Sequence, residues 1–107
     1  MIKVVLSRDD YGMCNGFHVT GHAGYADSGY DIICAAVSVL TQNTVNSIEQ
    51  LTDDELSYEV DTENGDLKCE LNGKISKESW LLIESMRLGL RSIEESYGEK
   101  YIKVIDK

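Results

Sequence analysis

His22 and Cys34 stand twelve residues apart and carry the two side-chain types that nucleophilic thiol chemistry requires. In that chemistry a thiolate attacks a carbonyl carbon, while an imidazole accepts the proton and later donates it. Gly24 and Gly29 lie between the two residues, and the backbone N–H groups of a glycine-bearing loop could stabilise the oxyanion that forms. We therefore take Cys34 as a candidate nucleophile and His22 as a candidate general base.

A cysteine in a helix is usually a small buried side chain without a catalytic role, and this is the alternative interpretation of Cys34. Asp31 is a plausible N-cap, so Cys34 would be the third helical residue, where N–H groups and the positive end of the helix dipole favour a thiolate. It lies about 100° from Ile33 around the helix axis, on the flank of the apolar stripe, where a substrate could reach it. Cys69 alternates with leucines and is predicted to lie in the core, and Cys14 has no comparable context.

His18 is the other histidine, and it lies on the same face of the predicted strand as His22. His22 is at the end of that strand, beside the loop that leads to Cys34, whereas His18 is about 13 Å further back along the strand. The same separation argues against a zinc site made by Cys14, His18 and His22, because ligands must lie within ~2.0–2.3 Å of one ion. We expect no metal.

The elements that would position these residues follow from the spacing of apolar side chains. Strands are predicted where apolar and polar residues alternate, and helices where apolar residues recur every three or four positions. Asn64 and Gly65 mark a hairpin turn, and Ser76 and Gly98 are predicted to bound the second helix. The order is ββαββαβ, a single α+β domain of residues 1–107 with two helices on an antiparallel or mixed sheet. The predicted elements cover residues 2–7, 14–22, 32–51, 56–60, 67–71, 77–97 and 101–105.

Each predicted helix has an apolar stripe that should face the core. The stripe of the first consists of Ile33, Ala36, Val37, Leu40, Thr44, Ile48 and Leu51. The stripe of the second consists of Leu82, Met86, Leu90, Ile93 and Tyr97. Leu81 and Leu88 lie roughly opposite this second stripe, so that helix should be covered on two sides, either within the domain or between subunits.

The composition bears on the partners and the compartment. The 107 residues include 19 acidic and 10 basic side chains, for a net charge of −9. This charge disfavours nucleic-acid binding and favours a basic protein or peptide partner, although solubility alone would also account for it. Three cysteines without a CxxC spacing indicate a reducing cytoplasm. No apolar run approaches the ~18 residues of a membrane-spanning helix, and no signal segment is evident.

The segment that contains both candidates resembles the signature of the ribosomal-processing cysteine protease family, Prp. Gly21-His22 is followed, after a loop, by residues 29–35, which read Gly-Tyr-Asp-Ile-Ile-Cys-Ala, and Ser38 stands four residues after the cysteine. The resemblance implies that Cys34 is the nucleophile and that His22 is its general base and later its acid.

Supporting positions of the same signature fall on Gly21, Asp31 and Ser38. Asp31 could hold the imidazolium of His22, although a nearby carboxylate opposes thiolate formation at Cys34. Ser38 could reach back toward the thiol, or it could simply hydrogen-bond to the backbone of its own helix.

The resemblance also implies an activity. The protein would be a cysteine endopeptidase that removes the N-terminal extension of the twenty-seventh bacterial large-subunit ribosomal protein. It would be cytoplasmic and homodimeric, and it would need no cofactor. Cleavage would follow a hydrophobic segment ending in paired aromatics.

In the loop of residues 23–30, Tyr25, Gly29 and Tyr30 are candidate substrate contacts, with ordinary loop packing as the alternative for the tyrosines. The rival functions are a non-enzymatic ribosome-assembly or peptide-binding module and a redox sensor, which would lack a resolving cysteine.

Overall fold

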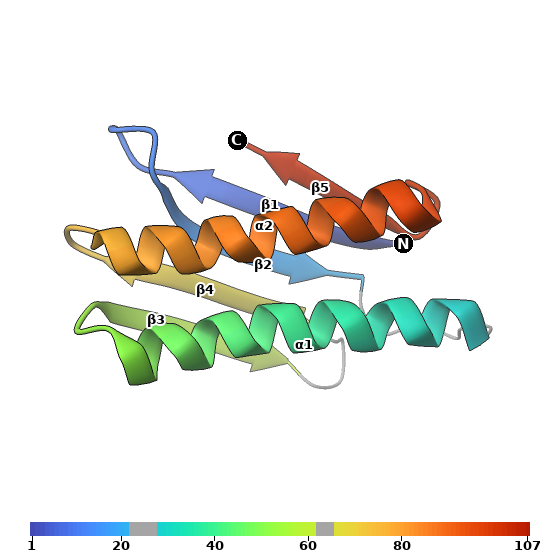
Figure 1. Cartoon of the computed structure of the whole chain (residues 1–107), viewed down its shortest axis with the longest axis horizontal. Helices are drawn as coiled ribbons and strands as arrows, with labels where there is room; N and C mark the ends of the chain where they lie inside the picture. Colours follow the sequence, from blue (N-terminus) through green and yellow to red (C-terminus); the bar gives the residue numbers. More distant parts are fainter. Residues whose placement is uncertain (22–27, 62–65) are drawn as a thin grey trace.

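The computed structural model describes residues 1–21, 28–61 and 66–107, with residues 28–31 described as backbone only. Its elements follow the predicted order ββαββαβ (Figure 1). They are β1 Ile2–Arg8, β2 Cys14–Thr20, α1 Ser28–Leu51, β3 Glu55–Asp61, β4 Asp66–Asn72, α2 Lys77–Tyr97 and β5 Ile102–Asp106.

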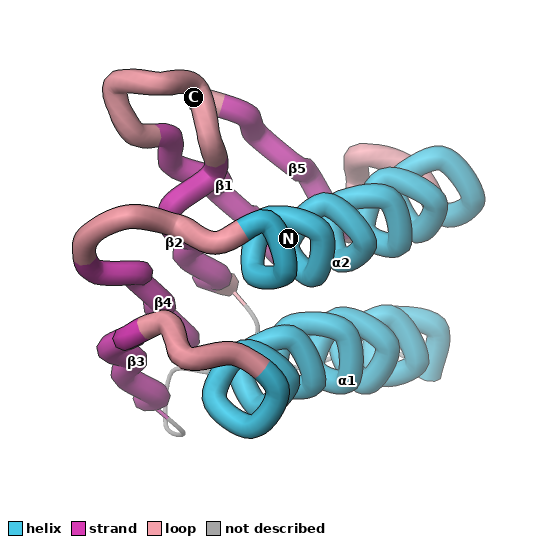
Figure 2. Tube along the Cα trace, turned by 60° about the vertical axis from the view of Figure 1, so that its left-hand side comes forward, coloured by secondary structure: helices cyan, strands magenta, loops and turns pink. Residues whose placement is uncertain are grey.

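The five strands form one mixed sheet in the order β3-β4-β2-β1-β5. β1 pairs with β5 in parallel, and the other neighbouring strands are antiparallel. The two helices lie side by side on one face of this sheet and leave the other face open (Figure 2). The molecule therefore has two layers, and the core lies between them.

Strand alternation explains which side chains enter the core. Ile2, Val4 and Leu6 of β1 are buried under the helices, whereas Lys3 is exposed on the open face. The same alternation buries one face of each of the other central strands. Cys14, Phe17, Val19, Leu67, Cys69, Leu71, Ile102 and Val104 complete the sheet side of the core.

The first helix contributes the predicted stripe with one exception. Ile33, Val37 and Ile48 are buried, but Leu51, the last residue of α1, is exposed. A Cβ on Gly89 of α2 would lie 3.0 Å from a methyl carbon of Leu40, so the absence of a side chain at this glycine lets the two helices pack closely.

The second helix has the predicted ends. The Ser76 hydroxyl accepts a hydrogen bond from the Ser79 backbone N–H at 3.1 Å, and the Gly98 N–H donates to the Glu94 carbonyl at 2.8 Å. The Ser76 hydroxyl also donates to Asp54 Oδ2 at 2.6 Å, which ties the start of α2 to the residues before β3. The two bonds within the helix ends are local, and for that reason they could be predicted from the sequence.

The stripe of α2 is rotated from its predicted position. Ile83, which is absent from the predicted stripe, is fully buried with Met86 and Leu90, whereas Tyr97 is exposed. Leu81 and Leu88 are 60% and 66% exposed. The second apolar side of this helix is therefore not covered by the domain itself.

β3 also differs from prediction. The sequence predicts a hairpin that buries one apolar face along both strands, and β4 does so. In β3, however, Leu56 is only half-buried, and Tyr58 and Val60 remain 46% and 47% exposed. β3 is the edge strand beside β4, so its inward side chains are at the margin of the helical layer.

Candidate active site

The chain leaves β2 at Gly21, whose φ of 74° is a backbone conformation that other residues rarely adopt. A Cβ at this position would also collide with the carbonyl oxygen of Met1. The strand ends at Thr20, so our prediction that it continues to His22 is wrong. Residues 22–27, which include His22 and Tyr25, lie outside the described residues.

The first helix starts at Ser28, earlier than predicted. Asp31 is therefore not the N-cap but the fourth helical residue, and the backbones of Gly29 and Tyr30 belong to the first turn rather than to a loop. Asp27, Ser28 and Asp31 are all of the capping type, so local preference alone does not distinguish among them. An acidic residue inside the first turn is also favoured by the helix dipole.

This earlier start changes the environment of Cys34. The thiol is on the seventh residue of α1, beyond the four residues whose N–H groups lack partners within the helix. The positive end of the helix dipole therefore favours a thiolate at Cys34 less than it would if the helix began after Asp31. The reason is that the effect of the dipole falls off within the first turn. The predicted position on the flank is confirmed, since Ile33 is buried while Cys34 is half-buried and packed against the core.

The other two cysteines are inaccessible. Cys14 and Cys69 are fully buried and form no disulfide. Burial raises the pKa of the Cys69 thiol to about 12 and also raises the pKa of Cys14, although a hydrogen bond with the backbone of Gly16 partly opposes the second shift. Of the three thiols, Cys34 is the one that a substrate can approach.

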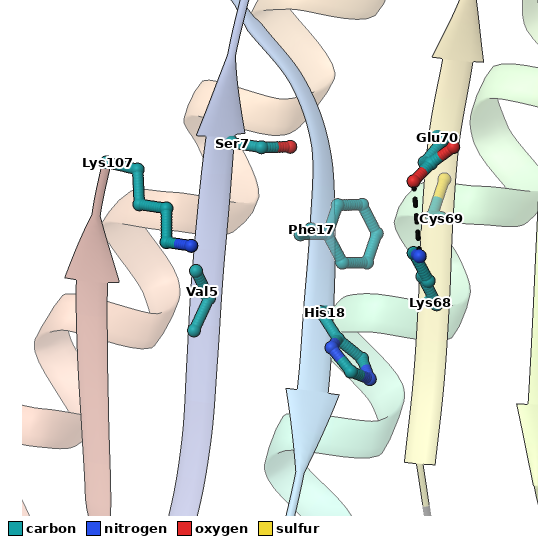
Figure 3. Close-up of a pocket in the computed structure, with 8 residues that line it drawn as sticks. All are labelled: Val5, Ser7, Phe17, His18, Lys68, Cys69, Glu70 and Lys107. Atoms are coloured by element: carbon teal, nitrogen blue, oxygen red, sulfur yellow. Dashed lines mark ion pairs between the residues drawn. The ribbon is translucent and has the colours of Figure 1, made fainter.

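His18 lies on the open face of the sheet, away from the helices (Figure 3). It lines a cavity of about 230 Å³ together with Val5, Ser7, Phe17, Lys68, Cys69, Glu70 and Lys107. The exposed Lys68 and Glu70 form an ion pair of 3.4 Å there. The sheet separates His18 from the helix that carries Cys34, so His18 is not placed to act on that thiol. A shift in the pairing of β1 with β2 next to Arg8 breaks the alternation, so Cys14 is buried in the core while His18 is exposed, and these two are not placed to share a metal ion.

Cys34 begins a row of side chains along one flank of α1. Ser38 and Val45 lie within about 40° of Cys34 around the helix axis, at ~100° per residue. Ser38 is half-buried, one turn after the thiol, as predicted from its spacing. Leu40, on the other flank, packs against α2 at Gly89. The Cys34 flank therefore faces away from α2.

A groove continues this flank between α1 and β3. It has a volume of about 290 Å³ and is lined by Gln42, Val45, Asn46, Tyr58, Val60 and Leu67. We did not predict this groove, because alternation in β3 indicates which residues share a face but not how far the helical layer covers that face.

Among the described residues, no three His, Cys, Asp or Glu side chains are grouped so that they could hold a metal ion. No helix in the described part of the chain is long and apolar enough to cross a membrane.

Comparison with known proteins agrees with a thiol site in this fold. A sequence model of the family described as "Cysteine protease Prp" matches residues 1–103. The ribosomal processing cysteine protease Prp of Bacillus subtilis (strain 168) is 31% identical over 104 residues, which cover 92% of each chain. The protein of the same description from Staphylococcus aureus (strain NCTC 8325 / PS 47) is 30% identical over 99 residues, covering 92% of this chain and 93% of its own.

Solved structures extend the similarity to the whole fold. The crystal structure of an essential ribosomal processing protease Prp from S. aureus in complex with a substrate peptide matches 100% of both chains, with a TM-score of 0.92 and 28% identity. A second structure of that protease, with a covalently linked product peptide, matches 100% of both chains with a TM-score of 0.88 and 29% identity. The accessible thiol, the two-layer fold and these relatives agree: this chain belongs to the Prp family of cysteine proteases.

Proposed function

We propose that this cysteine protease cleaves its substrate with Cys34 as nucleophile and His22 as general base. The observation that carries the proposal is that Cys34 is the accessible one of the three thiols. The position of His18 supports the choice of base: the chain has two histidines, and His18 is across the sheet from α1. Family membership argues against the non-enzymatic peptide-binding module as an alternative.

The reaction would proceed in two stages. The Cys34 thiolate attacks the peptide carbonyl carbon, and the imidazolium of His22 donates its proton to the leaving amine as the C–N bond breaks. A thioester then joins Cys34 to the N-terminal part of the substrate. Neutral His22 takes a proton from water, which attacks the thioester and releases the carboxylate product and the thiol. The covalently linked product peptide in the S. aureus relative supports a covalent intermediate.

The proposed substrate is the N-terminal extension of the twenty-seventh large-subunit ribosomal protein, and the proposed compartment is the cytoplasm. The names of the relatives, which are ribosomal processing proteases, support this class of substrate. Ribosomal proteins are basic, and a chain with a net charge of −9 attracts a basic partner at long range. Tyr25, Gly29 and Tyr30 remain the proposed contacts for the aromatic residues before the cut.

We further propose that the enzyme is a homodimer that pairs through the outer face of its helical layer. Leu81 and Leu88 of α2 are exposed on this face, and α1 exposes Ile32 and Val39. Leucines repeated at this spacing on an uncovered helix face are typical of a surface that packs against another helix.

Incubation with the purified ribosomal protein from the same organism, followed by mass spectrometry, tests the proposed activity. We expect loss of an N-terminal peptide and a rate that falls with added salt, because salt screens the attraction over ~8 Å at physiological ionic strength. An uncleaved ribosomal protein, in the presence of enzyme whose Cys34 reacts with a thiol reagent, would contradict the substrate assignment.

A further inference from the structure

The groove between α1 and β3 leaves an apolar surface uncovered. Tyr58 and Val60 are inward residues of their strand, yet each is nearly half exposed. Buried Val45 and Leu67 form the floor of the groove, while Gln42 and Asn46 supply amide groups at its α1 wall. A hollow with apolar walls and a few hydrogen-bonding groups is typical of a site for an apolar side chain on a polar backbone.

The groove lies on the same flank of α1 as the candidate nucleophile. Val45 is on the same flank of α1 as Cys34, and Ser38 lies between them along the helix. Val45 follows Cys34 by eleven positions along the helix, which corresponds to ~16 Å at ~1.5 Å per residue. An extended peptide advances ~3.3 Å per residue, so a peptide whose scissile bond is at Cys34 would reach the groove about five residues away.

The charges around the groove favour a basic peptide. Glu59 and Asp61 flank Val60 along β3, and Asp66 and Lys68 flank Leu67 along β4. On α1, Glu49 follows Asn46 by one turn and is exposed. Acidic side chains thus outnumber basic ones beside the lining residues, which suits lysine or arginine next to an apolar anchor.

The position of β3 suits an extended ligand. β3 is an edge strand of the described sheet, and the backbone of an edge strand can pair with an added peptide strand. The groove opens on the side of β3 that faces α1, so a peptide lying along the edge could direct alternate side chains beneath the helix.

We propose that this groove is a substrate subsite that binds an apolar side chain about five residues from the scissile bond, flanked by basic residues. The inference rests on the proposed function, because it takes Cys34 as the point of cleavage. It adds Tyr58 and Val60 as residues that determine specificity. They would contribute to substrate binding rather than to the chemical step.

The test uses two fluorogenic peptides that span the cleavage junction. The long one extends on both sides beyond the ~5-residue reach, and the short one stops before it. The enzyme variant is Tyr58→Asn/Val60→Asn, and the matched control is Ser57→Asn, which puts the same side chain on the opposite face of the same strand. We expect the double variant to raise KM for the long peptide about tenfold with kcat unchanged, since two half-buried apolar side chains are lost. The double variant should cleave the short peptide with the kcat and KM of wild type. The control variant should cleave both peptides with wild-type kinetics.

Two further measurements keep the inference testable whatever the kinetics show. In a Cys34→Ala background, fluorescence anisotropy of the labelled long peptide should show a similar loss of affinity for the double variant. The wild-type enzyme should show the same increase in KM on a long peptide in which serine replaces the apolar residue about five positions from the cut. If wild type cleaves the long peptide and the double variant has the same KM and affinity, the groove is not a subsite, although the proposed function stands. If wild type cleaves neither peptide, the proposed function fails, and equal anisotropy affinities of the two proteins would then overturn the subsite as well.

Discussion

The carbonyl oxygen of Met1 occupies the space that a side chain on Gly21 would need. This contact joins the start of β1 to the end of β2, at the point where the chain turns toward His22. Gly21 is therefore required twice, once for its φ of 74° and once for the missing Cβ.

We predict that Gly21→Ala destabilises the fold more than Gly73→Ala does. Gly73 has a similar φ of 76°, but no atom lies within 4 Å of the point where its Cβ would stand, so its substitution should cost only the backbone strain of about 1–2 kcal/mol. Gly21→Ala adds a backbone collision. Urea unfolding of both variants measures the difference, and equal losses of stability would mean that the Met1 contact is unimportant.

The three thiols should react at different rates with a neutral-pH thiol reagent. Cys34 is half-buried and should be labelled first, whereas Cys14 and Cys69 are fully buried and have raised pKa values, so they are mostly protonated and shielded. Peptide mapping after brief labelling locates the modified residue. Cys34→Ala should remove the fast phase, and a fast phase that persists in this variant would contradict the assignment.

Cys34→Ala and His22→Ala should each abolish cleavage without unfolding the protein. The reason is that each removes a reacting group, and Cys34 is at the flank of the core rather than in its centre. His18→Ala is the control for loss of an imidazole and should keep full activity, because His18 is on the open face of the sheet. Cys14→Ala and Cys69→Ala should also stay active, with some loss of stability from the core. Circular dichroism and a cleavage assay on each variant distinguish these effects, and normal cleavage by Cys34→Ala would refute the nucleophile assignment.

Asp106 should make the fold sensitive to acid. Its carboxylate accepts hydrogen bonds from Arg87 Nη2 at 2.7 Å and Arg91 Nη2 at 2.9 Å, and Arg8 Nη2 lies 3.3 Å away. Hydrogen bonds from Arg87 above all, and then from Arg91, lower the pKa of Asp106 well below its usual value, although partial burial opposes them. Because the folded-state pKa is lower than the unfolded one, this stabilisation is complete above pH ~4 and is lost as the pH falls further.

Asp106→Asn is therefore expected to lower the free energy of unfolding by about 2 kcal/mol at pH 7, which is the typical contribution of hydrogen bonds to a charged group. The difference from wild type should shrink as the pH falls below ~4, because the carboxylate of the unfolded wild-type chain then becomes protonated while that of the folded chain is still ionised. Glu95→Gln removes one exposed carboxylate of α2, the helix that carries Arg87 and Arg91, and serves as the control. Thermal unfolding over a pH series measures both, and a difference that stays constant down to the lowest pH would contradict the ion-pair explanation.

The proposed homodimer can be tested by sedimentation at micromolar concentration. Wild type should sediment as a dimer of the 11.9 kDa chain. Leu81→Glu/Leu88→Glu should shift it to the monomer, because two charged groups would be buried in the interface. Tyr11→Glu changes another exposed apolar residue, in the turn between β1 and β2, and should leave the dimer intact. A wild-type protein that sediments only as a monomer would refute the dimer.

The order of the helices and strands and the ends of α2 were determined by interactions between residues close together in the sequence. Apolar periodicity specified the order ββαββαβ, and the caps Ser76 and Gly98 specified the ends of α2, because the hydrogen bonds that bound a helix are made by neighbouring residues. The place of Cys34 beside the buried Ile33 follows from the geometry of the helix alone.

The tertiary structure decided what depends on contacts between distant segments. Alternation puts His18 on one face of β2, but only the placement of both helices on the opposite face separates it from Cys34. In the same way, the pattern of β3 predicts an apolar face, yet its exposure follows from the sheet order, which leaves β3 at an edge. The start of α1 at Ser28 was missed because several capping residues precede Cys34 and the sequence does not rank them. Sheet order and the cover that a helix provides arise from packing between remote parts of the chain, and so they appear only when the whole chain is folded.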